Sequence, residues 1–359
     1  MKGQLGAKWL IRAYETEDEI GIWELCKALY PETESDWEQW LRWWRWMYKE
    51  NPAGAPSIWI AEHGTKIVGQ YPLVPFDMKV GDQVLKVLQN IDVMTHPDYR
   101  HQGIFSALER RALDEAAKAG LHITFGFPNA AAYPGHMKSG WFDLGTMQVG
   151  LKSLNWSKAV RLKVRNKLLS TILGMGAAVA FDKVLFRTRK LPPREEVEVD
   201  VAARFDDRVS VLWGMVSGEY PIAVARNRQY LNWRYGSPGN SYRIFVAREA
   251  GDMSGYIVLE HKKHDDLRLS YIFDLIATSE ATMHGLLSMA VESCRSNETD
   301  AILYPLIANE TYRHVLKNNG FIFWHSGHFC ACSSSLHVPK EFLAKRENWF
   351  VQIGDSDMR

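Results

Sequence analysis

The chain has 359 residues, which is long for one ordinary domain and suits two. Apolar residues make up 46% and charged residues 24%, as in globular proteins with a sizeable core. The 43 Lys and Arg residues nearly balance the 42 Asp and Glu residues, so the chain has no bulk attraction to nucleic acid, and nucleic acid is not expected as a partner. Four scattered cysteines without zinc-site spacing exclude a disulfide framework and predict no metal, and the absence of a signal-peptide core at the N-terminus favours a cytoplasmic protein.

The first 150 residues alternate between strand-like and helical patterns. A strand at 9–13 precedes a helix that runs to Leu29 and is opened by a Thr16–Glu19 capping box. The tryptophan-rich segment 37–48 is interpreted as an amphipathic helix packed on the core, with an aromatic acceptor-site wall as the alternative. The remaining predictions are strands at 58–62, 67–74 and 84–95, a helix at 105–119, a strand at 122–127 and a short helix or turn at 129–139.

Segment 156–190 differs in character, because its ends are basic and its centre, Leu168–Phe181, is mostly apolar. This centre is too short to span a bilayer, which needs about 20 residues. A helix packed between two domains is expected, and a helix lying on a membrane surface is the alternative. The expected domains are therefore 1–150 and 201–359, joined by a basic and apolar linker over 151–200.

The second half repeats the pattern of the first. In each half a strand that contains an aspartate (Asp92, Asp274) is followed by a helix and another strand. Ten residues then separate an asparagine from a glycine–aromatic pair: Asn129 from Gly140-Trp141, and Asn309 from Gly320-Phe321. The pattern predicts an α/β (α+β) chain of two tandem copies of one fold, each a mixed, mostly antiparallel sheet flanked by helices.

The two copies differ where a phosphate site is expected. In the first, Arg100 and Gly103 lie in a short loop between a strand and a helix. Unpaired backbone N–H groups at the helix N-terminus suit a pyrophosphate, Gly103 permits close approach, and Arg100 adds positive charge. The second copy has no such loop and carries Glu280 at the start of its helix, so anion binding is expected in the first half only.

The segment 96–108, with the sequence HPDYRHQGIFSAL, resembles the acetyl-CoA signature of the GNAT superfamily, whose core is Arg/Gln-x-x-Gly-x-Gly/Ala. Phe105 stands where that signature has its last small residue. The block Phe127–Trp141 is similar to the Asn-x-x-Ala-x-x-x-Tyr-x-x-x-Gly-Phe pattern of the same family. The resemblance covers about 10–141 and, more weakly, 242–321, and it implies a tandem-GNAT protein whose second domain is degenerate.

This resemblance implies acetyl-CoA, or another acyl-CoA, as the acyl donor. In GNAT proteins the asparagine of the second block binds the pantetheine arm, and a backbone N–H on the preceding strand polarises the thioester carbonyl. The residues expected to bind the donor are Val93, Met94, Thr95, Arg100, His101, Gln102, Gly103, Ile104, Phe105, Ser106 and Asn129.

The catalytic residues expected from the resemblance are Tyr133, His136 and Asp92. The family's tyrosine protonates the departing thiolate; His136 stands at that position, and Tyr133 lies three residues earlier. Either side chain can donate a proton, and Tyr133 is slightly preferred because Pro134 and Gly135 can shift the helix register. Asp92 is the candidate general base, with a structural hydrogen-bonding role as the alternative.

The function expected is therefore transfer of an acetyl or acyl group from CoA to a primary amine of a small molecule or sugar, by direct attack. The chain is expected to be a monomer with an internal pseudo-dimer, or a homodimer. Two other functions stay open: a CoA-binding sensor or scaffold without turnover, and a transferase that uses aminoacyl-tRNA or a long-chain acyl donor.

Overall fold

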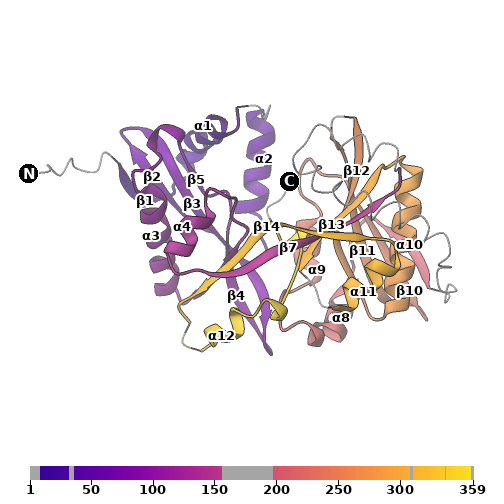
Figure 1. Cartoon of the computed structure of the whole chain (residues 1–359). Helices are drawn as coiled ribbons and strands as arrows, with labels where there is room; N and C mark the ends of the chain where they lie inside the picture. Colours follow the sequence, from indigo (N-terminus) through magenta and orange to yellow (C-terminus); the bar gives the residue numbers. More distant parts are fainter. Residues whose placement is uncertain are drawn as a thin grey trace, which may run out of the picture.

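The computed structural model describes residues 9–31, 36–155, 197–264, 266–307, 310–335 and 337–356 (Figure 1). The helix expected within 156–190 lies outside these residues, as does Asn309 of the internal repeat. Within the described ranges, no helix is both long and apolar enough to cross a membrane.

The first half of the chain builds one of two lobes, drawn in indigo to magenta in Figure 1. Its elements, in chain order, are β1 (Leu10–Ala13), η1 (Thr16–Asp18), α1 (Glu19–Leu29), α2 (Trp37–Tyr48), β2 (Ser57–His63), β3 (Lys66–Val80), β4 (Gln83–Asn90), β5 (Met94–Thr95), η2 (Pro97–Tyr99), α3 (Ile104–Lys118), β6 (Ile123–Gly126), α4 (Tyr133–Lys138) and β7 (Phe142–Ser153).

The second half builds most of the other lobe. Its described elements are β8 (Glu198–Ala202), α8 (Arg208–Val216), η4 (Ser217–Glu219), β9 (Ile222–Val224), α9 (Arg228–Arg234), β10 (Tyr242–Glu249), β11 (Asp252–His264), β12 (Leu267–Ala277), α10 (Glu280–Ser296), β13 (Ala301–Ile307), α11 (Glu310–Asn318), β14 (Ile322–Ser333), α12 (Lys340–Leu343), η5 (Arg346–Asn348), β15 (Trp349–Gln352) and η6 (Ile353–Asp355).

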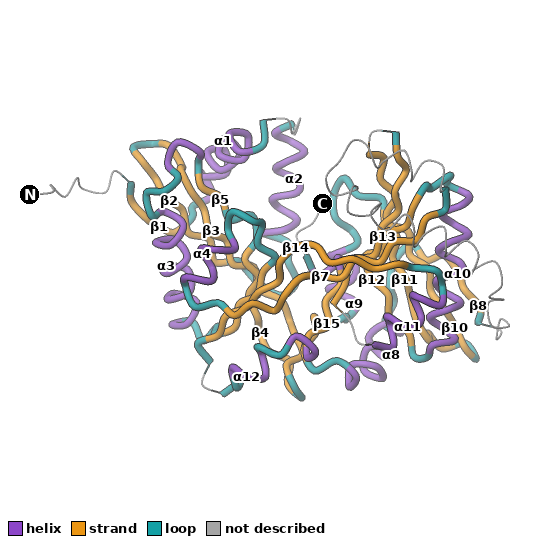
Figure 2. The backbone as a smooth tube through the Cα atoms, in the orientation of Figure 1, coloured by secondary structure: helices purple, strands orange, loops and turns teal. Residues whose placement is uncertain are grey.

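One sheet runs through both lobes (Figure 2), in the order β1-β2-β3-β4-β6-β14-β7-β13-β12-β11-β10-β8. Along this path only the β4–β6 and β12–β13 pairs are parallel. The predicted mixed, mostly antiparallel α/β fold is confirmed. The order β2-β3-β4-α3-β6-α4-β7 in the first half recurs as β10-β11-β12-α10-β13-α11-β14 in the second.

The two lobes exchange strands at the centre of the sheet, where β7 and β14 cross from one lobe to the other (Figure 1). β14 of the second half lies between β6 and β7, with Cys330 opposite Gly126. β7 of the first half pairs in turn with β13, with Ser153 opposite Ala301. Each half therefore covers an edge that the other half would leave unpaired.

Successive side chains of β3 point to opposite faces of the sheet, so the core of the first lobe has two sides. Tyr71 and Leu73 pack with the apolar face of α3. Val74 and Phe76, which point to the opposite face, belong to the larger cluster that contains the tryptophans of α2. Trp44 is fully buried in that cluster, so the predicted packing of the tryptophan-rich helix on the core is confirmed.

Two local predictions are wrong. The capping box before α1 is formed by Glu15 and Asp18, one residue earlier than the predicted Thr16–Glu19 pair, because a turn of 3₁₀ helix precedes α1. The strand predicted at 84–95 is interrupted after Asn90, because Asp92 adopts the left-handed region with φ +49° and turns the chain.

Candidate active site

The loop before α3 ends at Gly103, the N-cap residue of the helix. Its φ of +82° lies in the left-handed region that glycine adopts without strain, and no described atom lies within 4 Å of the place that a Cβ would take. The first backbone N–H groups of a helix have no intrahelical acceptor, and at α3 no side chain of the N-cap residue takes that place, because Gly103 has none. Of the predicted contacts, Arg100, His101, Gln102, Gly103 and Ser106 are exposed, Phe105 is half-buried and Ile104 is buried.

The matching helix of the second half, α10, begins differently. Ser279 is its N-cap residue, and the Ser279 hydroxyl oxygen accepts a hydrogen bond from the backbone N–H of Thr282 at 3.1 Å. Glu280 adds a negative charge in the first turn. A capped helix end with an acidic first turn disfavours a phosphate, whereas the uncapped start of α3 is suited to one.

β4 and β6 diverge close to this loop. Their ladder ends at the Gln89–Phe125 pair, after which Asp92 turns the chain so that β5 pairs with β3 instead. Backbone groups on diverging strands can bind an extended ligand by adding to the sheet. Three of the residues predicted to bind the donor lie on the diverging segment: Val93 and Thr95 are half-buried, and Met94 is buried.

The corresponding divergence in the second half is filled by the chain itself. β12 and β13 pair only over Leu269–Tyr271 of β12, and beyond this β15 pairs with β13, with Gln352 opposite Leu306. The Gln352 side chain accepts from the backbone N–H of Leu275 on β12 at 2.8 Å and donates to its carbonyl oxygen at 3.3 Å. β15 and Gln352 thus bridge the two strands.

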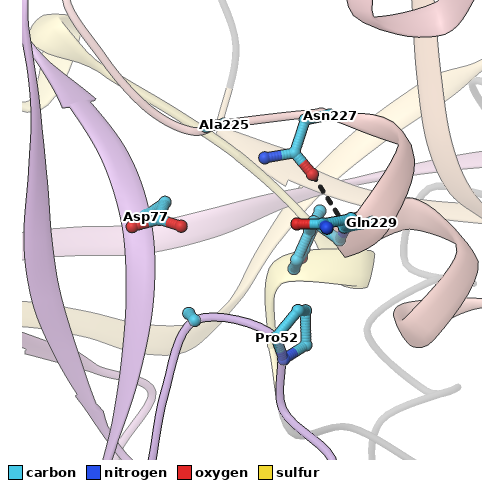
Figure 3. Close-up of a pocket in the computed structure, with 7 residues that line it drawn as sticks. Pro52, Asp77, Ala225, Asn227 and Gln229 are labelled. Atoms are coloured by element: carbon cyan, nitrogen blue, oxygen red, sulfur yellow. Dashed lines mark hydrogen bonds between the residues drawn. The ribbon is translucent and has the colours of Figure 1, made fainter. Parts of the chain in front are cut away.

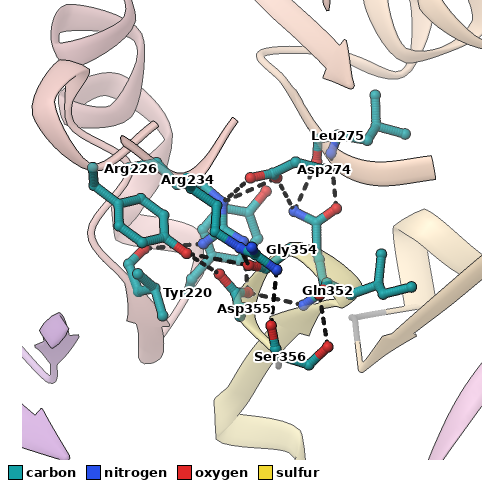
Figure 4. A network of polar contacts seen from close by, with 12 residues as sticks. Tyr220, Arg226, Arg234, Asp274, Leu275, Gln352, Gly354, Asp355 and Ser356 are labelled. Carbon is teal, nitrogen blue, oxygen red and sulfur yellow. Dashed lines mark hydrogen bonds and ion pairs between the residues drawn. The ribbon is translucent and has the colours of Figure 1, made fainter. Parts of the chain in front are cut away.

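A buried ion network anchors this bridging segment (Figure 4). Arg226 donates to both Asp274 oxygens at 3.1 and 3.2 Å and to Asp355 at 2.8 Å, and all three side chains are essentially unexposed. Although burial opposes the charge, the two carboxylates raise the pKa of Arg226 well above its ordinary value. Burial raises the pKa of Asp274, and Arg226 opposes that rise.

Asp92, the predicted base, is half-buried where β4 ends, and its Oδ2 accepts from the Tyr48 hydroxyl at 3.1 Å. The second half repeats this contact, since Asp274 Oδ2 accepts from the Tyr235 hydroxyl at 3.0 Å. A tyrosine–aspartate pair in both halves, including the half whose divergence is filled, is a structural feature of the repeat.

Tyr133 begins α4 and faces the exchanged strands. Its hydroxyl donates to Asp143 Oδ2 of β7 at 2.8 Å, and its ring stacks on His328 of β14 with centroids 3.9 Å apart. The hydrogen bond to Asp143 raises the pKa of Tyr133. Asn129, the predicted pantetheine contact, is exposed, and its Oδ1 accepts from the backbone N–H groups of Ala131 and Ala132 in the turn before α4, at 3.0 and 2.9 Å.

His136 lies on the inner side of α4 and is 1% exposed. Its Nδ1 contacts Glu109 Oε1 of α3 at 2.5 Å, and its Nε2 lies 3.1 Å from the side-chain nitrogen of Asn90 at the end of β4. The structure therefore does not bring Tyr133 and His136 together: one is directed to β7 and β14, the other to β4.

Phe105, which departs from the small residue of the signature, is accommodated by a second departure in α4. A Cβ on Gly135 would lie 2.4 Å from the Phe105 ring. The ring also packs edge-on against His136, with centroids 5.1 Å apart. A large residue on α3 thus requires a glycine at this position of α4.

A separate small pocket lies between the two halves (Figure 3). Two of its polar side chains have partners within the protein: Asp77 pairs with Lys86 at 2.6 Å, and Asn227 Oδ1 caps α9 by accepting from the Tyr230 N–H at 2.9 Å. This pocket shares no residue with the predicted site. It is lined by Pro52, Ala53, Asp77, Ala225, Asn227, Gln229 and Tyr230.

Residues 10–142 match the family described as the acetyltransferase (GNAT) domain. This part of the chain is therefore similar to GNAT domains and is called the GNAT domain below. The match includes β4, the Gly103 loop, α3, β6 and α4, so every predicted site residue falls inside the GNAT domain. The family match supports acyl transfer as the class of reaction. No curated protein shows significant sequence similarity to the chain.

Solved structures resemble nearly the whole chain in fold. A GCN5-related N-acetyltransferase from Anabaena variabilis is 13% identical with a TM-score of 0.62, over 90% of this chain and 72% of that one. A conserved Enterococcus faecalis protein, described as a "Probable N-Acyltransferase", is 11% identical with a TM-score of 0.64, over 92% and 74%. A GCN5-related N-acetyltransferase from Kribbella flavida is 13% identical with a TM-score of 0.57, over 90% and 70%.

The sequence analysis missed Glu109, whose carboxylate contacts His136 inside the GNAT domain. A signal was present, since Glu109 lies four residues after Phe105 on the inward face of α3, among Leu108 and Ala112. An acidic residue on a buried helix face needs partners, and this requirement distinguishes Glu109 from the exposed carboxylates of the same helix.

Proposed function

We propose that the GNAT domain binds an acyl-CoA at the N-terminus of α3 and transfers the acyl group to a primary amine of a small molecule or sugar. The observation that carries the proposal is the uncapped helix start at Gly103, placed beside the diverging strands β4 and β6. Exposed Arg100 adds charge beside the free N–H groups.

The binding residues divide by the part of the donor that they would hold. The segment Arg100–Ser106 would hold the pyrophosphate through backbone N–H groups and the Arg100 guanidinium. The segment Val93–Thr95 would hold the pantetheine arm and polarise the thioester carbonyl through a backbone N–H. Asn129 would contribute its side-chain N–H group, because its Oδ1 already accepts from the backbone of the turn before α4.

Two side chains supply the proton chemistry in this proposal, one as base and one as acid. Asp92 is the base that receives the proton lost by the attacking amine, and Tyr48 holds its carboxylate. Tyr133 or His136 supplies a proton to the departing sulfur. Most of the rate enhancement would come from holding amine and thioester together in the correct orientation.

The second half is proposed to be a degenerate GNAT-like domain, 201–359, joined to the domain 1–150 through the linker 151–200. The repeated element order supports this division. The capped start of α10 and the insertion of β15 between β12 and β13 support the absence of a second donor site. One acyl-CoA per chain is therefore expected.

Calorimetric titration of acetyl-CoA into the full chain tests the proposal. Wild type should bind with a micromolar dissociation constant and a stoichiometry of one. Arg100→Ala should weaken binding by about 10- to 100-fold, the worth of a charge-assisted hydrogen bond, and Gly103→Glu should abolish it. Ser279→Ala, at the matching helix of the second half, is the control and should leave binding unchanged.

The same experiment separates the other functions. Binding without acyl transfer to any amine in a panel of polyamines, amino sugars and lysine peptides would favour a CoA-binding sensor or scaffold. If the wild-type protein does not bind acetyl-CoA, the proposal of an acetyl donor is overturned. Long-chain acyl-CoA and aminoacyl-tRNA would then be titrated in the same way.

A further inference from the structure

Four aromatic side chains gather where β6 ends and its neighbour β4 diverges from it. Phe127 directly follows β6, and its ring stacks on Phe329 of β14 with centroids 5.2 Å apart. Phe125 packs edge-on against both rings, at 6.0 and 6.3 Å. Trp349 of β15 lies 5.1 Å from Phe329 and 6.0 Å from Phe125. These four residues are called the Phe127 cluster.

Of the Phe127 cluster, only Phe127 itself is partly exposed. Phe125 and Phe329 are 0% exposed, and Trp349 is 2% exposed. The indole N–H of Trp349 donates to the Leu343 carbonyl oxygen at 2.7 Å, which fixes this ring. A close-packed interior takes up an added group only at the cost of strain. Phe127 therefore has no space to move inward, because the buried rings behind it occupy that space.

Phe127 lies on the same face of the sheet as the Asp92 carboxylate. Phe125 contacts Phe76 of β3 with centroids 6.2 Å apart, on the face opposite α3. Phe127 packs against this same core, which also contains Tyr48 of α2. The Tyr48 hydroxyl donates to Asp92 at the end of β4. Asp92 and Phe127 thus flank the divergence, one from the β4 side and the other from the β6 side.

The proposed donor would direct its acyl chain to Phe127. A backbone N–H of Val93–Thr95, on the β4 side, would hold the carbonyl oxygen, and the sulfur would continue into the pantetheine arm. The three substituents of a planar carbonyl carbon point in different directions, so the alkyl chain is left with the β6 side of the divergence. Phe127 is the first residue beyond β6 on that side.

We infer that Phe127, backed by Phe329, limits the acyl group to a short one, so that acetyl-CoA binds in preference to hexanoyl-CoA; this rests on the proposed function. A longer chain has to displace a packed ring or turn the thioester away from the N–H that holds it, and both weaken binding. Because Phe329 belongs to the exchanged strand β14, the second half contributes a determinant of donor specificity to the first.

Calorimetric titration of acetyl-CoA and hexanoyl-CoA into the full chain tests the inference through the ratio of the two dissociation constants. Wild type should bind hexanoyl-CoA about 10- to 100-fold more weakly than acetyl-CoA. Phe127→Ala opens space at the partly exposed ring and should bring the two constants close together. Phe329→Leu, which shortens the ring behind it, should lower the ratio by a smaller factor. Phe323→Ala is the matched control and should keep the wild-type ratio, because this half-buried ring lies earlier on β14, opposite Gly150.

The outcomes separate this inference from the proposed function. If wild type binds neither acyl-CoA, the proposed function fails and the inference with it. If wild type binds hexanoyl-CoA as tightly as acetyl-CoA or more tightly, the donor site stands and only the limit on chain length is overturned. A preference for acetyl-CoA that persists in Phe127→Ala would also overturn the inference, since other residues would then set the limit. Circular dichroism checks that each variant folds; should Phe127→Ala not fold, Phe127→Leu replaces it.

Discussion

The indole N–H groups of Trp46 and Trp233 each donate a hydrogen bond to the other residue's backbone carbonyl oxygen, at 2.8 and 2.9 Å. Their rings stack with centroids 4.9 Å apart. Trp46 lies in α2 of the first half and Trp233 in α9 of the second, so each half donates to and accepts from the other in the same way. Reciprocal contacts of this kind are typical of a two-fold symmetric dimer interface, and here they occur within one chain.

Replacing either indole should therefore destabilise the junction of the halves. Trp233→Phe removes one hydrogen bond and leaves the Trp46 carbonyl unpaired, which should lower the free energy of unfolding by about 1–3 kcal/mol. Denaturant titration of both single variants and of the double variant checks this, and the two losses should not add, because the residues are in contact. Trp37→Phe, whose ring stacks within the first half, is the control; additive losses would contradict the reciprocal contact.

Phe105 and Gly135 form a second testable pair. Gly135→Ala should destabilise the protein by about 1–3 kcal/mol through overpacking, although alanine normally favours a helix over glycine. Shortening the opposing ring should remove the clash, so Phe105→Ala together with Gly135→Ala should be more stable than the sum of the single effects predicts. Thermal unfolding of the three variants measures this, and a harmless Gly135→Ala would show that α4 does not pack against the ring as described.

Arg226 holds two buried carboxylates, so its loss should be severe. Arg226→Met leaves Asp274 and Asp355 buried without a cation and should cost about 3–5 kcal/mol at neutral pH. Without the cation, burial would raise the pKa of Asp274 further above its unfolded value, so the variant should be most stable at low pH and lose stability as the pH rises. Arg226→Lys retains the charge and should lose less; a pH-independent loss would argue against buried carboxylates as the cause.

Tyr133 offers a titration that does not depend on activity. The hydrogen bond to Asp143 raises its pKa, so this contact stabilises the fold below the ordinary tyrosine pKa of about 10 and is lost as the pH rises through the folded value. Asp143→Asn should lower the pKa of Tyr133, read from ¹³Cζ-tyrosine spectra against Tyr133→Phe. His328→Ala, which removes only the stacked ring, should leave the titration nearly unchanged. Equal titration in wild type and Asp143→Asn would show that the hydroxyl is not bonded to Asp143 in solution.

The order of the elements and the place of the glycine loop before α3 were predictable because both depend on local sequence. Gly103 marks a left-handed residue at a helix start, and hydrophobic periodicity marks α3 after it. The repeat was visible for the same reason, since each copy carries its own strand, helix and strand in the same order. Asp92 shows the limit: its backbone conformation, which interrupts the strand, has no clear signal in the residues around it.

Contacts between distant segments were not predictable. Cys330 pairs with Gly126 across some two hundred residues of chain, and an alternating strand pattern does not say which edge a strand will join. The pairing of Glu109 with His136 depends on how α3 and α4 approach each other. His136 could be aligned with the family's tyrosine from sequence, but only the structure shows what holds its ring.

Because β7 and β14 are exchanged, the sheet of each half is complete only when the other half is present. Without the second half, the first would keep its Gly103 loop but would expose β6 as an open edge, and β7 would lack the strands that flank it. The second half thus supplies strands that complete the sheet of the first. Two separate chains would have to meet at sufficient concentration to build the same sheet; a fused pair does so at any dilution.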